Sequence, residues 1–415
     1  MSASTRWLAA CLLAGTAVAA HADSEFSGQL RGRWDDRTAS LIGPLAQAAQ
    51  LDPTVAPPQA SAATLEAELR GRWQMLSAVA TLRSEKPESA AWHSDGVMNE
   101  LYASGEAAGW QLSAGRKIVA WDVGYAFRPN DIIQQERRRT LLSFTPEGRA
   151  LLMGEHFDAR TAWSLVWVNP QRAVDDDAGS AMGAEEQALA LRVFRNVGEA
   201  DWHGFARWGQ HTRASLGAAV SWVADDSLEL HASGRWAERA DVLTFNTPAS
   251  GLATSSPFTV ATRNNCAQAL VGGTWTAENR LSLMAEFWYD GTAASNAQWD
   301  DWQARNAQIT AAWVNGGPAA LRRGVAGNLA WQSQAFAGQS LRRSNVYLRA
   351  SWDHEGWQPS LDVLYMPADG GRMVTAALGW QGDRVRVDAG LRVNGGPDDS
   401  VAAQLPVRRQ AYAAL

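Results

Sequence analysis

The stretch Leu65-Glu66-Ala67-Glu68-Leu69-Arg70-Gly71-Arg72-Trp73 decides the fold of this chain. Apolar or small residues alternate there with charged ones, so one set is Leu, Ala, Leu, Gly and Trp and the other is Glu, Glu, Arg and Arg. Successive side chains of a β-strand point to opposite faces, so the stretch predicts a strand with one apolar and one charged face. Such a strand fits a membrane β-barrel, whose outer face meets lipid and whose inner face meets water.

The same alternation recurs along the chain and predicts about 18 strands. Tight turns are expected near 74, 108, 158, 198, 225, 278, 355 and 382. Longer connections are expected at 36–62, 84–96, 119–147, 169–184, 239–265, 291–342 and 395–404, with two short ones near 211 and 369. Short periplasmic turns and long extracellular loops are typical of transmembrane antiparallel up-and-down β-barrels. Poor alternation at 98–105 and 150–157 leaves a barrel of about 16 strands as the alternative.

The N-terminal residues 1–22 are interpreted as a cleaved signal peptide. They contain Arg6, an apolar run over 7–14 and the cleavage pattern Ala20-His21-Ala22. Residues 23–415 are then expected to form one barrel domain in the outer membrane of a Gram-negative bacterium, delivered by the barrel-assembly machinery and contacting lipid and lipopolysaccharide. The 21 tryptophans often fall at strand ends, as in the aromatic belts of membrane barrels. The alternative is a soluble β-protein with a tryptophan-rich core.

Arginine supplies most of the positive charge of a chain whose formal net charge is -6. The strand registers place many arginines on the charged, inner face, and the predicted pore-lining set is Arg31, Arg33, Arg70, Arg72, Arg207, Arg235, Arg349, Arg386 and Arg392. A basic wall in a narrow channel of low dielectric constant favours anions. The alternative is that Arg–Glu pairs on neighbouring strands neutralise one another.

Residues 118–139 are too apolar for a solvated loop and too irregular for a strand. We expect this segment to fold into the lumen, with aromatic side chains packed on the wall. The predicted pore constriction consists of Arg116, Lys117, Trp121, Asp122, Tyr125, Arg128, Asp131, Arg137, Arg138 and Arg139. An ordered loop that caps the extracellular mouth is the alternative.

Several motifs lie in and around this segment: Asn99-Glu100-Leu101-Tyr102, Gly115-Arg116-Lys117, Trp121, Gly124 and Asp131-Ile132-Ile133. The pattern resembles porin-type and alginate-export-like outer-membrane barrels, in which a strand ends in Gly-Arg-Gln or Gly-Arg-Lys and runs through Trp-Gly or Tyr-Gly into an inward loop. Here Asp122-Val123 separate the tryptophan from the glycine. The resemblance covers about 40 of the 415 residues and implies a channel without naming its solute.

Two helices are expected in the long connection at 291–342, one over 296–313 and one over 321–336. The first carries Trp299, Trp302, Ile309 and Trp313 on one stripe. Aromatic side chains on a pore loop can stack against sugar rings. The alternative is that the stripe packs the helix onto the barrel.

No catalytic arrangement is evident in the sequence. It contains no Gly-x-Ser-x-Gly, and Glu155-His156 and Asp353-His354-Glu355 lack metal-ligand spacing. We therefore expect a protein that is not an enzyme, with no cofactor, no metal and no nucleic-acid partner. The predicted function is a passive channel for small or polymeric anionic, sugar-like solutes. The alternatives are a non-conducting dock or sleeve in an exopolysaccharide or secretion assembly, as a homo-oligomer or with a periplasmic export partner, and an outer-membrane hydrolase.

Overall fold

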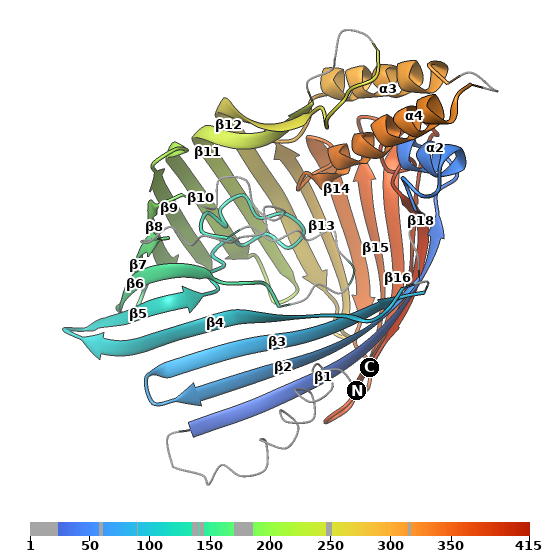
Figure 1. Ribbon diagram of the computed structural model, residues 1–415. Helices are drawn as coiled ribbons and strands as arrows, with labels where there is room; N and C mark the ends of the chain where they lie inside the picture. The colour runs from blue at the N-terminus through green and yellow to red at the C-terminus, as the bar shows by residue number, and fades with distance from the viewer. Residues whose placement is uncertain are drawn as a thin grey trace.

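The computed structural model describes residues 24–57, 61–88, 90–134, 141, 145–169, 186–245, 251–313 and 317–415. Over these residues the chain forms a closed antiparallel barrel of 18 strands, in which each strand pairs with the next and β18 pairs with β1 (Figure 1). The strands are β1 (Ser24–Ala39), β2 (Ala62–Trp73), β3 (Leu76–Pro87), β4 (His93–Ala107), β5 (Trp110–Lys117), β6 (Arg149–Phe157), β7 (Thr161–Val168), β8 (Ala188–Val197), β9 (Ala200–Gly209), β10 (Arg213–Val223), β11 (Leu228–Phe245), β12 (Phe258–Thr276), β13 (Leu281–Asp290), β14 (Ser344–Trp352), β15 (Trp357–Met366), β16 (Gly371–Gln381), β17 (Arg386–Gly395) and β18 (Val407–Ala414). The predicted fold class is confirmed, with 18 strands rather than 16.

The two faces of the wall differ as the alternating sequence predicts. Leu30 of β1 and Leu69 of β2 are 72% and 49% exposed, whereas Glu66 and Glu68 on the alternate positions of β2 are buried. Cross-strand partners such as Gly28 and Leu69 share a face, so the apolar set covers the outside and the charged set lines the inside. A continuous apolar outer surface is what a barrel in lipid requires.

Aromatic side chains form two belts on the outer face. On β15, Trp357 and Tyr365 lie at opposite ends of the strand and are 49% and 42% exposed. Eight residue steps span about 26 Å along a strand, or about 20 Å along the barrel axis at a tilt of about 40°. That height is close to the apolar band of outer-membrane barrels, about 25 Å.

Both chain termini of the described barrel lie at one end, here called the turn end, and the long connections lie at the other, the loop end (Figure 1). Tight turns occur at the turn end in all eight predicted places. Two predicted loops are shorter than expected. β3 extends to Pro87 and β4 begins at His93, and the β11–β12 hairpin extends to Phe245 and resumes at Phe258.

A helical cap covers part of the loop end. It consists of α2 (Pro44–Leu51), α3 (Asn296–Ala311), α4 (Ala319–Gln332) and the 3-10 helix η1 (Ser333–Ala337). Trp299 and Trp302 of α3 are fully buried against barrel residues such as Met366, so the aromatic stripe packs the helix onto the barrel. The connection at 36–62 was expected to be a plain loop, but part of it forms α2. Ala48 of this helix packs against α4, which stabilises it. None of the described helices has the length and apolarity needed to cross a membrane.

Candidate functional site

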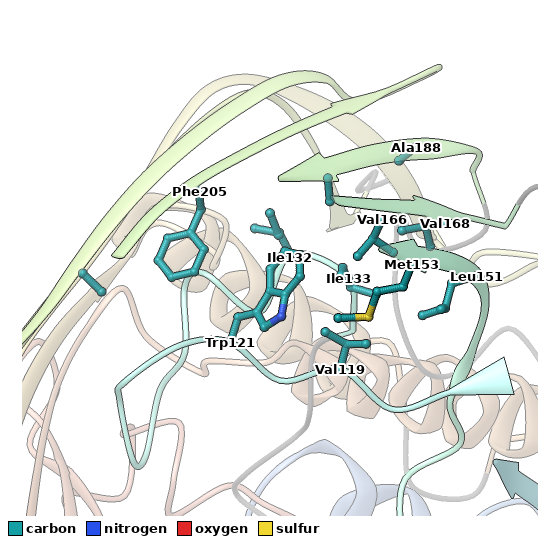
Figure 2. Close-up of a cluster of buried hydrophobic side chains, with 12 residues drawn as sticks. Val119, Trp121, Ile132, Ile133, Leu151, Met153, Val166, Val168, Ala188 and Phe205 are labelled. Atoms are coloured by element: carbon teal, nitrogen blue, oxygen red, sulfur yellow. The ribbon is translucent and has the colours of Figure 1, made fainter. Parts of the chain in front are cut away.

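The inward loop is the connection at 118–148 between β5 and β6, and its described residues 118–134 enter the barrel (Figure 1). Trp121 stacks on Phe205 of β9, with ring centroids 6.5 Å apart. Ile132 and Ile133 pack among inner-face residues of β6, β7, β8 and β10, as Figure 2 shows for several of them. The described part of the loop therefore lies in the lumen against the wall, and the alternative of a loop confined to the extracellular mouth is excluded.

The tip of the loop is held by two further aromatic contacts. Phe127 stacks on Trp288 of β13, with centroids 5.6 Å apart and planes 11° from parallel. Tyr125 stacks on Tyr347 of β14 at 5.8 Å. Offset aromatic pairs add stability beyond the area they bury. Together with Trp121, these residues fix the loop along the wall from β9 to β14.

The carboxylate of Glu286 on β13 clamps the tip. The backbone N–H groups of Tyr125 and Ala126 donate to its Oε1 and Oε2 at 2.6 and 2.7 Å. His231 Nε2 lies 2.9 Å from Oε1, and His231 Nδ1 lies 3.1 Å from Oε2 of Glu229. Glu286 is only 2% exposed, so these charge-assisted hydrogen bonds are shielded from water.

Two buried aspartates fold the loop back on itself. Asp131 Oδ1 accepts from the backbone N–H groups of Trp121 and Asp122 at 2.8 and 3.0 Å. Asp122 accepts from the backbone N–H of Asn130 and from the Ser233 hydroxyl on β11, at 2.5 and 2.6 Å. Burial raises the pKa of both carboxyls, that of Asp131 to about 6. These predicted constriction residues therefore hold the loop's shape and do not face an open passage.

Two basic residues predicted for the constriction, Lys117 and Arg128, make different contacts. Lys117 Nζ lies 4.0 Å from a Glu155 oxygen and 5.2 Å from the centre of the Tyr102 ring. Arg128 Nε donates to the Gly124 carbonyl at 2.7 Å and its guanidinium lies 3.7 Å from Asp131.

Arg116, which was predicted to line the constriction, does not face the lumen. Its cross-strand partner is Leu101, which is 49% exposed on the outer face, and its ion pair is with Glu147. Because cross-strand partners share a face, Arg116 lies on the outer side of the wall. The irregular backbone at Gly115, with φ of +134°, lies directly before it. Arg137, Arg138 and Arg139 lie outside the described residues.

The inner faces of β1, β2 and β3 carry a ladder of arginines and acids. Arg33 pairs with Asp35 at 2.7 Å and Arg70 with Glu68 at 2.6 Å, in each case two residues along the same strand. The arginines outnumber the acids: Arg31, Arg33, Arg37, Arg70, Arg72 and Arg83 face Glu25, Asp35, Glu66, Glu68 and Glu85. Ion pairs with the acids therefore neutralise part of the positive charge of these arginines. Most of these pairs join residues of the same strand, whereas the alternative interpretation expected pairs between neighbouring strands.

The remaining predicted lining residues divide into buried and accessible groups. Arg207 is 8% exposed and bonds to Glu186 at 2.8 Å, and Arg235 donates to the Pro129 carbonyl at 3.4 Å beneath the inward loop. By contrast, the Arg70 and Arg386 side chains are 58% and 51% exposed, although Arg386 pairs with Asp388 at 2.8 Å. The accessible arginines are the ones that a solute can meet.

A pocket lies between the loop tip and the wall formed by β13 to β17. Its lining includes Phe127, Trp288, Tyr347, Asp362, Thr375 and Arg392. Arg349 donates to Asp362 at 3.0 Å and to the Tyr125 hydroxyl at 3.1 Å, and Arg392 Nε donates to the Thr375 hydroxyl at 2.9 Å. The pocket combines aromatic faces with a carboxylate, a hydroxyl and a guanidinium, a mixture suited to a small polar ligand.

Sequence reasoning missed the residues that fasten the loop. Glu286 and His231 are recognisable as inner-face residues, but they are 55 positions apart, and nothing local connects them to Tyr125 or Ala126. Asn130 and Ser233 form a similar long-range pair, with Nδ2 donating to the hydroxyl at 2.9 Å. Over the described residues, no cluster of His, Cys, Asp or Glu is arranged to hold a metal ion.

No protein-family model matches the chain, and no curated protein matches it in sequence. Solved structures do share its fold. OccAB1 of Acinetobacter baumannii superposes with a TM-score of 0.55 at 10% identity, over 94% of this chain and 95% of that one. OccAB4 of the same organism gives 0.53 at 8% identity over 94% and 97%, and OccK5 (OpdH) of Pseudomonas aeruginosa gives 0.51 at 11% over 95% and 97%.

At these identities the likeness establishes a shared porin-type barrel fold over nearly the whole chain. The porin-type part of the predicted resemblance is confirmed in that sense. The alginate-export-like part stays a prediction.

Proposed function

We propose that the protein is an outer-membrane channel for the passive passage of small or polymeric anionic, sugar-like solutes. One observation carries the proposal. The first arm of the inward loop, residues 118–134, packs against the wall between β6 and β14, while accessible arginines such as Arg70 and Arg386 lie on other strands, β2 and β17. A solute moving past the loop would travel along a wall whose accessible charge is mainly basic.

The electrostatic effect follows from the shape of the lumen. Field lines in a channel with low-dielectric walls are focused, so a modest excess of positive side chains concentrates anions. Asp122 and Asp131 on the loop oppose this effect only in part, because backbone N–H groups donate to both carboxylates and the Arg128 guanidinium lies 3.7 Å from Asp131. Bidentate guanidinium contacts then suit carboxylate or phosphate groups on the solute.

The sugar-like character of the solute rests on the pocket beside the loop tip. Phe127, Trp288 and Tyr347 offer aromatic faces, and Asp362 and Thr375 offer hydrogen-bonding groups. Sugar rings present both an apolar face and a rim of hydroxyls, which match such a mixture. No chemical step is required of the protein.

The test is single-channel recording of refolded protein in a planar bilayer under a salt gradient. We expect a steady conductance with a reversal potential on the anion-selective side. Replacing Arg70 and Arg72 together by glutamine should move the reversal potential toward zero, because the variant removes two accessible positive charges from the lumen. Arg160→Gln, which removes an exposed charge from a turn, is the matched control.

Two outcomes would contradict the proposal. A cation-selective conductance would contradict the basic passage. No conductance from protein that is folded, as judged by its heat-dependent mobility on gels, would favour the non-conducting dock or sleeve.

A further inference from the structure

Two arginines face outward near the loop end of β16 and β18, the strands on either side of β17. Arg372 on β16 is the cross-strand partner of Tyr365, which is 42% exposed on the outer face. Arg409 on β18 is the partner of Val393 on β17, which is 40% exposed on the same face. Cross-strand partners share a face, so both guanidinium groups lie on the lipid side of the wall. Among the described residues, neither has an ion pair or a side-chain hydrogen bond.

Their height in the barrel explains how they are tolerated. Arg372 lies level with Tyr365, a member of the loop-end aromatic belt. Arg409 is the cross-strand partner of Thr38, one residue before the loop end of β1 at Ala39. A lipid-facing arginine is strongly unfavourable at the membrane midplane but costs little at the interface. Both side chains are therefore placed at the level of lipid headgroups.

Between the two arginines, β17 presents a glycine at the level of Arg372. Gly395 on β17 is the partner of Arg372, and β17 lies between β16 and β18. A Cβ atom built on Gly395 meets no described heavy atom within 4 Å. The acids of this region are Asp36 on β1, which faces outward opposite Ala411 and accepts a hydrogen bond from Ser61 Oγ at 3.1 Å, and the exposed Asp398 and Asp399 in the connection after β17. Two cations thus flank a stretch of β17 that no side chain covers at Gly395, and neither of them is paired with an acid of the described residues.

We propose that the outer surface between Arg372 and Arg409 binds the phosphate of a phosphorylated lipid in the outer leaflet. Arg372 and Arg409 bracket the phosphate, since a guanidinium group matches phosphate oxygens with two parallel hydrogen bonds. The acyl chains lie against the apolar surface below, which includes Val374 and Val393. That surface selects a lipid over free phosphate, because a free anion gains nothing from it.

The experiment measures binding of diphosphorylated lipid A to the full chain, refolded in detergent, by native mass spectrometry. The double variant Arg372→Gln/Arg409→Gln should bind about a hundredfold more weakly, about tenfold for each guanidinium group removed. Arg384→Gln is the matched control, because it removes the same charge from the β16–β17 turn at the opposite end and should bind as the unchanged protein does. Arg372→Lys should give an intermediate weakening, since an ammonium group lacks the planar fork.

Three outcomes would overturn the proposal. Equal binding of lipid A from which the phosphates have been removed would mean that the headgroup is not recognised. Displacement of lipid A by an equal concentration of inorganic phosphate would mean a general anion site. Unchanged binding by the double variant would exclude the two arginines.

This inference does not rest on the proposed channel. The two arginines face away from the lumen, so the double variant should keep the reversal potential of the unchanged protein. Loss of lipid binding with intact conduction, or the reverse, therefore separates the two proposals. If the double variant does not fold, lipid A binding and the reversal potential of the Arg372→Lys variant are compared with those of the unchanged protein instead.

Discussion

Replacing Glu286 by glutamine tests whether the inward loop is clamped as the structure indicates. The change keeps the size of the side chain but converts one accepting oxygen into an NH2 group. One of the two N–H donors, on Tyr125 or Ala126, then faces another donor. A buried hydrogen bond to a charged group contributes about 1.5–3 kcal/mol, and an unsatisfied buried donor costs about 1–3 kcal/mol. We expect the closed loop to be destabilised by about 2–3 kcal/mol.

Hydrogen exchange of the loop amides measures this destabilisation directly. If the loop opens locally, the opening constant of the segment containing Tyr125 and Ala126 should rise about 30- to 140-fold, at about 1.4 kcal/mol per factor of ten. Single-channel current should also become noisier, as the tip detaches and returns.

Glu229→Gln is the matched control for this prediction. Glu229 lies 3.1 Å from the same His231 and accepts a hydrogen bond from Ser221, but among the described residues it has no hydrogen bond or ion pair with the inward loop. Its replacement should leave exchange at Tyr125 and Ala126 unchanged. If Glu286→Gln and Glu229→Gln behave alike, the carboxylate does not clamp the tip and the reasoning fails.

Three further predictions concern the loop and the cap. Burial raises the pKa of Asp131 from 3.8 to about 6, so the closed loop loses stability as the pH rises from about 3.8 to about 6, by about 3 kcal/mol in full, and loses no more above that range. Lowering the pH from 7 to 5 should therefore stabilise the closed loop by about 1.3 kcal/mol and reduce its opening constant about tenfold, and Asp131→Asn should remove this dependence. Trp121→Ala should weaken loop packing by about 3–5 kcal/mol and raise loop exchange without unfolding the barrel in a gel-shift assay. Trp302→Ala, which removes a fully buried side chain, should destabilise the cap by a similar amount, measured as protease cleavage within α3 or α4, while barrel resistance to heat and detergent is retained.

The barrel was predictable from the sequence because each strand carries its own two-residue period. The alternation in 65–73 fixes which residues of β2 face outward, and in the structure these residues pair with the outward-facing residues of β1. The two strands that alternate poorly have identifiable causes. On β6, Leu151 and Met153 face inward but are buried beneath the inward loop, so both faces of that strand are apolar. On β4, the register shifts opposite Val79 and Ala80, which breaks the period near Asn99.

The details of the candidate site were less predictable, because they depend on contacts between distant residues. That Trp121 packs on the wall follows from its apolar character, but its partner Phe205 does not. Acids are usually solvated, which is why the sequence places Asp122 and Asp131 at the passage. Backbone N–H groups brought together by the fold satisfy them instead. Arg116 lies on the same face as Trp110 and Leu112, so the two-residue period of β5 already places it outward, and the prediction that it faces the lumen was wrong.

The seam between β1 and β18 sets this barrel apart from a row of hairpins. Within the described chain it joins Arg33 to Ala414, and Gly32 and Leu415 exchange two backbone hydrogen bonds of 2.9 Å. Closing a ring of that length costs about 5 kcal/mol in chain entropy by logarithmic scaling alone. Until it closes, a growing sheet exposes two unpaired edges that can capture a strand of another chain. Assembly of this protein therefore depends on a single late encounter, during which its first and last strands must be kept from the wrong partner.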